Sequence, residues 1–305
     1  MVPTVTRTPS RKPKNYVFFG KFNYYVPGAA DIFILLGWLL IGAVIGNAVT
    51  AVFAILMKDP EAAMECGMLV SYPIMFIPAM MYAGIKSSRN SFNKDGVKLD
   101  SSHFSPLGAV VCAIIVVVAT ISASFCMDAV SSVMPQMPDA LKELLESMTT
   151  GTVWINFLTV SIFAPLCEEW LCRGMVLRGL LNNKVKPVWA IILSAVFFAV
   201  IHLNPWQAVP AFVLGCLFGY VYYRTGSLKL TMLMHFANNT FALVCSHIPA
   251  FQDVESWTDV LPGRMYWIIF AACIIVVALS ILSFNKIKLQ RSQGNSDEAP
   301  CLFNE

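Results

Sequence analysis

Long runs of apolar residues recur along this 305-residue chain, and most of them approach the length needed to cross a bilayer. The hydrocarbon layer is about 30 Å thick, so a helix needs roughly 20 apolar residues to span it. Hydrophobic residues make up 57% of the sequence and charged residues only 13%, a balance outside the range of soluble globular domains. The backbone must satisfy its own hydrogen bonds in lipid, and runs of this length do so as helices. The sequence therefore predicts an all-α, polytopic membrane protein.

The apolar runs predict about eight transmembrane helices in one bundle. We expect them at about residues 30–57, 67–86, 106–127, 152–178, 188–203, 207–223, 228–246 and 264–284. The fifth and sixth are short, but the Pro and Gly residues around them and the charges of the connections favour full spans. This membrane domain, residues 28–285, is expected to lie between a basic, aromatic interfacial segment at 1–27 and a polar cytoplasmic tail at 286–305.

The distribution of Lys and Arg predicts that both ends of the chain lie in the cytoplasm. Residues 1–27 contain five basic side chains and no acid, and such segments stay on the cytoplasmic side by the positive-inside rule. The connections then alternate: 86–105 is net basic and the fourth connection contains Arg178, Lys184 and Lys186, whereas 58–66 and 128–150 are net acidic. The formal net charge of +3 is spread over loops and tails, which excludes the basic patch typical of nucleic-acid binding.

Local signals predict several smaller features. The aromatic residues between 16 and 25 are typical of a segment lying on the cytoplasmic membrane surface. Leucines at helical spacing predict a surface helix over 139–148, on the outer side. Gly226 is suited to the positive φ that ends a helix, and Ser227 to capping the next one.

Three charged residues lie within the fourth apolar run: Glu168, Glu169 and Arg173. Ionisable groups at bilayer depth cost several kcal/mol each and are therefore most often functional. Residues four apart share a helix face, so Glu169 and Arg173 are expected to pair while Glu168 points elsewhere. One interpretation is a structural ion pair with a second carboxylate reaching the interface. The other leaves Glu168 facing a hydrated cavity as a general base.

Two later apolar runs carry histidines. His202 follows Phe198 by four residues, so the aromatic ring is expected beside the imidazole. His235 and Asn239 share one face of the seventh predicted helix and could both donate hydrogen bonds to one oxygen. The alternative is an interhelical polar contact, the role we expect for Asn238, which points away. With a rise of about 1.5 Å per residue, these groups fall within the hydrocarbon layer.

The motifs Glu168-Glu169-x3-Arg173, Phe198-x3-His202 and His235-x3-Asn239, in this order on successive apolar runs, resemble the CPBP intramembrane protease family. That family includes the type II CAAX prenyl endopeptidases and the Abi bacteriocin-immunity proteins. The resemblance covers about residues 150–247, which would be the catalytic core. It implies an eight-helix bundle with a conical cavity open to the cytoplasm and the membrane. It also implies that Glu168 and His202 activate a water, that His235 and Asn239 stabilise the oxyanion, and that Glu169, Arg173 and Phe198 support the site.

The sequence as a whole thus favours an intramembrane endopeptidase that needs no cofactor. Its expected partners are membrane lipids and a peptide or lipidated protein substrate, prenylated or not. A zinc-dependent version, with the metal held by Glu168, His202 and His235, is an alternative, although the chain has no H-E-x-x-H motif. A second alternative is a non-catalytic immunity or scaffold protein that binds a membrane partner. A transporter is disfavoured because the chain shows no paired repeats with broken helices.

Overall fold

The computed structural model describes residues 17–147, 151–248, 251 and 256–289. Within these ranges the chain is helical and contains no strand, which confirms the predicted all-α class. The ends of the predicted N-terminal segment and C-terminal tail, residues 1–16 and 290–305, lie outside the described residues. The predicted division into three parts therefore stays a prediction.

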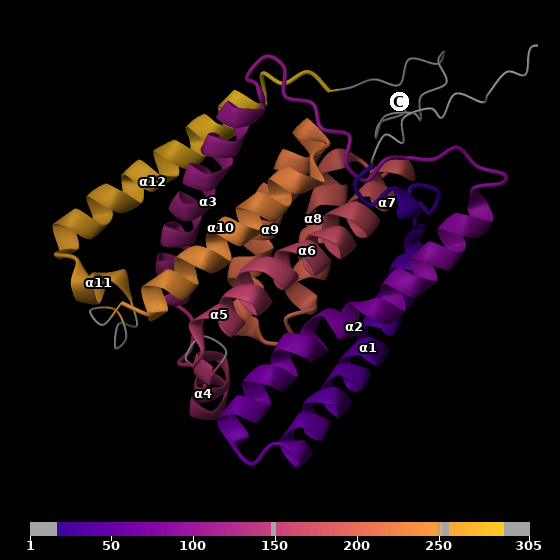
Figure 1. Ribbon diagram of the computed structural model, residues 1–305. Coiled ribbons are helices and arrows are strands. Elements are labelled where there is room, and N and C mark those ends of the chain that lie inside the picture. Colours follow the sequence, from indigo (N-terminus) through magenta and orange to yellow (C-terminus); the bar gives the residue numbers. More distant parts are fainter. Residues whose placement is uncertain (1–16, 148–150, 249–250, 252–255, 290–305) are drawn as a thin grey trace, which may run out of the picture.

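Long helices make up most of the described chain (Figure 1). They are α1 (Ala29–Leu56), α2 (Pro60–Asn90), α3 (Ala109–Ser131), the continuous helical stretch Val153–Asn182, α9 (Pro205–Thr225), α10 (Leu228–Ser246) and α12 (Gly263–Phe284). Shorter elements are the 3-10 turn η1 (Gly20–Phe22), α4 (Asp139–Ser147), α8 (Pro187–Val200) and α11 (Trp257–Val260).

Five helices in the described ranges are long and apolar enough to cross a membrane: α1, α2, α3, Val153–Asn182 and α12. This is an integral membrane protein, but the predicted count of eight spans is not confirmed. Helix α8 has only 14 residues, about 21 Å at 1.5 Å per residue, and is too short for the hydrocarbon layer. Helices α9 and α10 are long enough, but their polar residues lower their hydropathy.

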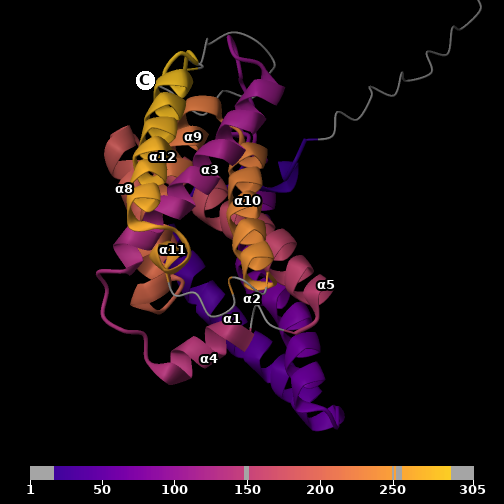
Figure 2. The same cartoon turned by 90° about the vertical axis from the view of Figure 1, so that its left-hand side faces the viewer.

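A central group of helices lies between two outer pairs (Figures 1 and 2). Helices α1 and α2 form a long hairpin at one edge, and α3 packs with α12 at the other. The stretch Val153–Asn182, α8, α9 and α10 lie between these pairs. The described N-terminal residues and the C-terminal end of α12 lie at the same end of the bundle, the upper end in Figure 1, which we call the termini side.

The α1–α2 hairpin depends on a close approach at Gly42. A Cβ atom built on Gly42 would lie 1.9 Å from the carbonyl oxygen of Met75, so a larger residue does not fit there. Small residues at helix contacts let backbones approach closely in membrane proteins. The position of α2, which carries one residue of the site described below, therefore depends on this glycine.

The N-terminal aromatic segment is buried more deeply than the sequence predicts. Phe22 and Tyr25 belong to the main hydrophobic core, and the Phe22 ring lies 5.2 Å from that of Trp170. Arg178, which we expected to lie in a cytoplasmic connection, is instead fully buried in the helix. Its guanidinium donates to the carbonyl oxygens of Gly174, of Val97 and of Tyr25. Satisfying a buried guanidinium with carbonyl oxygens offsets the cost of burying its charge, and it anchors the segment.

Two local predictions are confirmed. Gly226 ends α9 with φ 62°, and the hydroxyl of Ser227 accepts a hydrogen bond from the backbone N–H of Leu230 at the start of α10. A helix also forms near the expected surface position, as α4. These features follow from side-chain chemistry within a few residues, which is why the sequence alone predicts them.

Candidate active site

The helical stretch Val153–Asn182 contains two π-helical segments, one on each side of the two glutamates. It runs through α5 (Val153–Asn156), the π-helical segment η2 (Phe157–Phe163), α6 (Ala164–Glu169), the π-helical segment η3 (Trp170–Leu177) and α7 (Arg178–Asn182). Pro165 has no N–H to donate and its ring crowds the carbonyl four residues earlier, so an ordinary α-helix is disfavoured at this point. Segments of π-helix are rare and occur frequently at functional sites. Glu168 and Glu169 are therefore the last two residues of the short α-helix α6, which lies between the two π-helical segments.

The predicted pair of Glu169 and Arg173 forms. The Nη1 atom of Arg173 lies 2.8 Å from Oε1 of Glu169, and both side chains are fully buried. The other Nη atom donates to the carbonyl oxygen of Gly215 at 3.0 Å, and the guanidinium lies 4.7 Å from the centre of the Phe198 ring. A buried ion pair is tolerated only when its remaining groups are also satisfied, and these contacts do so in part. Arg173 thus connects Glu169 in α6 to Phe198 in α8 and to Gly215 in α9.

Glu168 points away from this pair, as expected, and towards α2. The hydroxyl of Tyr72 in α2 donates a hydrogen bond to Oε1 of Glu168. The second oxygen, Oε2, is buried and has no hydrogen-bond partner within the described residues. It lies 4.0 Å from Nε2 of His235. The site therefore contains a buried carboxylate with one oxygen held and the other available.

Tyr72 was missed by sequence reasoning. It lies 96 residues before Glu168, in an apolar run with no motif around it. The one available signal is that a tyrosine in the middle of a membrane helix needs a partner for its hydroxyl when it is buried. That signal does not say which partner it finds.

His235 joins the two glutamates. Its Nδ1 atom lies 3.1 Å from Oε1 of Glu169. A carboxylate paired with an arginine only accepts hydrogen bonds, so Nδ1 of His235 carries the proton and donates it. In the neutral ring this leaves the lone pair of Nε2 facing Glu168. The ring of Phe198 lies edge-on to the imidazole, with 5.5 Å between the ring centres.

His202 lies beside this cluster. It follows the end of α8 at Val200 and is half-buried. Its Nδ1 atom donates to the carbonyl oxygen of Phe198 at 2.7 Å, which leaves Nε2 as an acceptor. Phe198 contacts both imidazoles, because its ring centre lies 5.0 Å from that of His202. Within the part of the chain that the structure describes, no hydrogen bond or ion pair joins His202 to Glu168; His235 is the imidazole that faces the carboxylate.

Asn239 reaches the π-helical segment η2. Its side-chain amide donates to the carbonyl oxygen of Val160 at 2.8 Å, and its side-chain oxygen accepts from Asn238 at 3.0 Å. Asn238 in turn accepts a hydrogen bond from Ser124 of α3 at 2.5 Å, which is the interhelical contact predicted for it. An asparagine amide has two N–H groups, so one N–H of Asn239 is still available to a ligand.

The described residues do not assemble a ligand set for the zinc alternative. Among the described residues, no group of three or more His, Cys, Asp or Glu side chains is placed to hold a metal ion. Catalytic zinc sites use three protein ligands at about 2 Å from the metal, whereas within the described ranges no hydrogen bond or ion pair joins His202 to Glu168 or to His235. The arrangement of Glu168, His202 and His235 thus does not fit a zinc ion.

Residues 150–241 match a family described as "Type II CAAX prenyl endopeptidase Rce1-like". The matched segment contains Glu168, His202, His235 and Asn239 and ends two residues beyond the last of them. The resemblance inferred from the three motifs is thereby confirmed for this segment, which is less than half of the chain. Neither a curated protein nor a solved structure matches the sequence.

Proposed function

We propose that this membrane protein, which carries the type II CAAX prenyl endopeptidase pattern over residues 150–241, is an intramembrane endopeptidase. It hydrolyses a peptide bond in a membrane-associated peptide, prenylated CAAX peptides among the candidates, by means of a water activated by Glu168. One observation carries the proposal: the unpartnered Oε2 atom of Glu168, 4.0 Å from Nε2 of His235.

The gap between these two atoms suits a water molecule. One water forming two hydrogen bonds of about 2.8 Å can join acceptors that lie 4.0 Å apart. Both of its hydrogens then point to Glu168 and His235, which leaves an oxygen lone pair free to attack. The proposed water would also satisfy the buried carboxylate oxygen, whose isolation is otherwise unfavourable.

The surrounding residues orient this pair. Tyr72 holds Oε1 of Glu168, so that Oε2 is directed towards His235. Glu169 holds Nδ1 of His235 and is itself fixed by Arg173. Each of the two reacting side chains therefore has one atom held by the protein and one atom free, as a preorganised site requires.

The reaction follows from these positions. As the water oxygen bonds to the peptide carbonyl carbon, Glu168 takes up the proton that the water loses. As it gains negative charge, the carbonyl oxygen accepts a hydrogen bond from the available N–H of Asn239, while Nε2 of His235 keeps accepting from the attacking water. Glu168 then returns the proton to the peptide nitrogen as the C–N bond breaks. His202, whose ring contacts that of Phe198, offers Nε2 as an acceptor, and we assign it to holding the bound peptide or its attacking water.

Charge distribution and hydropathy support the remaining parts of the proposal. The chain has both termini in the cytoplasm, and its partners are the surrounding lipids and a peptide or lipidated protein substrate. The reaction uses no metal cofactor.

The decisive experiment compares the purified wild-type chain with the Glu168→Gln variant. Each is incubated with a farnesylated CAAX peptide and with unmodified membrane peptides, and the products are identified by mass spectrometry. We expect cleavage by the wild type, loss of cleavage in Glu168→Gln, and no loss in Asp95→Asn, a control that removes an exposed acid in a loop. Circular dichroism checks that both variants keep their helices.

Two results would contradict the proposal. Cleavage of no peptide by the wild type, or equal cleavage by Glu168→Gln, would favour a non-catalytic scaffold, because a scaffold needs no water-activating carboxylate.

A further inference from the structure

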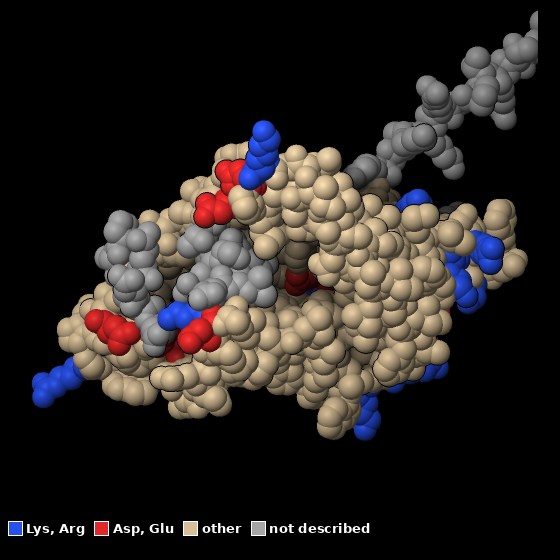
Figure 3. All heavy atoms as spheres, turned by 90° about the horizontal axis from the view of Figure 1, so that it is seen from below, with Lys and Arg blue, Asp and Glu red and all other residues tan. Residues whose placement is uncertain are grey.

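Glu65 differs from the neighbouring acids at the start of α2. Figure 3 views the molecule from the end opposite to the termini side, where α2 begins, and shows acidic side chains there, some of them in a depression between the helices. Asp59 and Glu61 are exposed, whereas Glu65 is half-buried. A carboxylate taken partly out of water needs hydrogen-bond partners, and the partner of Glu65 shows what this side chain holds.

Glu65 binds the chain where the helical stretch Val153–Asn182 begins. Its Oε1 atom accepts a hydrogen bond from the backbone N–H of Thr152 at 2.8 Å. The approach is close, because a Cβ atom built on Gly151 would overlap the same oxygen. The φ of Gly151 is 100°, a value that other residues rarely adopt. The carboxylate of Glu65 thus fixes the start of the stretch relative to α2.

Glu65, Met68 and Tyr72 share one face of α2. Residues three, four and seven apart lie on the same side of a helix, and seven residues correspond to about 10 Å along its axis. Glu65 therefore contacts the stretch about two turns away from Tyr72, whose hydroxyl donates to Glu168. Helix α2 thus holds the stretch at two levels, and the second of them is the proposed general base.

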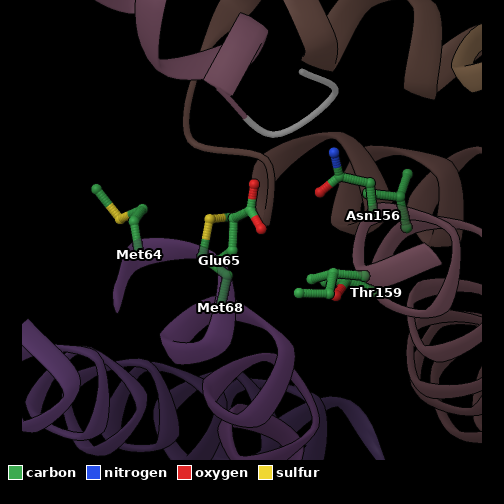
Figure 4. A pocket seen from close by; sticks show the side chains of 7 residues that line it. Met64, Glu65, Met68, Asn156 and Thr159 are labelled. Atoms are coloured by element: carbon green, nitrogen blue, oxygen red, sulfur yellow. The ribbon is translucent and has the colours of Figure 1, made fainter. Parts of the chain in front are cut away.

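A pocket lies between these two levels. It is lined by Glu65 and Met68 of α2 and, across from them, by Asn156 and Thr159 of the stretch (Figure 4). It has room for about one water molecule, and the buried hydroxyl of Thr159 has no partner within the described residues. Side chains that face a gap lose van der Waals contacts. Packing therefore restrains α2 against η2 less at this point, and the hydrogen bond of Glu65 contributes more to their relative position.

We infer that Glu65 is a positioning residue for the proposed reaction. By holding the N–H of Thr152, it sets the height of α6 relative to α2 and thereby the hydrogen bond from Tyr72 to Glu168. The inference rests on the proposed function for its kinetic consequence but not for the contact itself. Because the effect passes through one hydrogen bond, the loss of Glu65 lowers kcat no further than the loss of the Tyr72 hydroxyl does.

Two variants remove the contact from its two ends. Glu65→Met removes the acceptor and keeps an unbranched side chain of similar length. Thr152→Pro removes the donor and leaves α2 unchanged; the φ of Thr152 is −69°, close to the value of about −65° that proline requires, and its side chain makes no capping hydrogen bond. Three controls match them. Glu65→Gln keeps an acceptor oxygen, Thr152→Ala keeps the N–H, and Glu61→Met removes an exposed acid one turn earlier on α2.

Peptide cleavage, with kcat and KM determined separately, is the first assay. We expect Glu65→Met and Thr152→Pro to lower kcat by about tenfold at nearly constant KM, because a misplacement of about 1 Å can cost on the order of 100-fold. Glu65→Gln and Thr152→Ala should recover most of this loss, and Glu61→Met should match the wild type. In the Tyr72→Phe background, Glu65→Met should cost little more, because the hydroxyl that it positions is already absent.

An unchanged kcat in Glu65→Met would overturn the inference, and so would falls in kcat that multiply in the double variant, because a general loss of stability acts independently of Tyr72. If Glu65→Met does not fold, Thr152→Pro and its Thr152→Ala control decide by the same criteria.

Hydrogen exchange followed by mass spectrometry tests the contact without any substrate. In Glu65→Met we expect faster exchange of the backbone amides from residue 152 through α6, and wild-type exchange in Glu61→Met. No change, or faster exchange confined to residues 152–156, would refute the positioning of α6. If the purified protein cleaves no peptide, the proposed function fails, while the exchange result still decides whether Glu65 fixes α6.

Discussion

The hydrogen bond from Tyr72 to Glu168 leads to a specific kinetic prediction. Tyr72→Phe removes only the hydroxyl that holds Oε1 of Glu168 and leaves the ring that packs against Phe76 at 5.8 Å. A hydrogen bond to a charged group contributes about 1.5–3 kcal/mol. If that energy orients the carboxylate in the transition state, its loss lowers kcat by roughly 10- to 150-fold, since 1.36 kcal/mol corresponds to a factor of ten.

The assay is peptide cleavage by purified wild-type and variant protein, with kcat and KM determined separately. Tyr72 contacts the carboxylate and not the position of the peptide, so we expect kcat to fall while KM stays nearly constant. Tyr82→Phe is the matched control, because Tyr82 lies on the same helix and its hydroxyl donates to Asp31 at 3.4 Å, remote from the site. An unchanged kcat in Tyr72→Phe, or a rise in KM alone, would refute the positioning role. An equal fall in both variants would indicate a general effect on α2.

Three further predictions concern stability and metal dependence. Arg173→Met leaves Glu169 as a buried charge without its arginine and should destabilise the protein by about 3–5 kcal/mol. The loss should appear as a lower thermal unfolding midpoint in detergent. Adding Glu169→Gln should restore part of the stability, and no restoration would contradict the pairing. Gly42→Ala places a Cβ atom 1.9 Å from the carbonyl oxygen of Met75 and should destabilise the α1–α2 hairpin by about 1–3 kcal/mol. Gly37→Ala is the control and should leave stability unchanged, because nothing lies within 4 Å of a Cβ atom built there. Equal unfolding midpoints for the two variants would disprove the close contact. Prolonged treatment with a chelator should leave peptide cleavage unchanged, and a loss of cleavage that zinc reverses would instead establish a metal-dependent reaction.

Local features of this protein could be predicted from its sequence. The all-α class follows from the apolar runs, because lipid leaves the backbone few alternatives to a helix. The pair of Glu169 and Arg173 follows from a spacing of four residues on one helix. The end of α9 at Gly226 likewise depends on one residue and its immediate neighbours.

Other features were decided only by the tertiary structure. Tyr72 reaches Glu168 from another helix, His235 rather than His202 faces the carboxylate, and Arg178 is buried under the N-terminal segment instead of lying in a loop. Helical periodicity determines which side chains share a face, but not which face meets which neighbour or at what height. Those contacts depend on packing between segments far apart in the chain, and a single sequence contains no local signal for them.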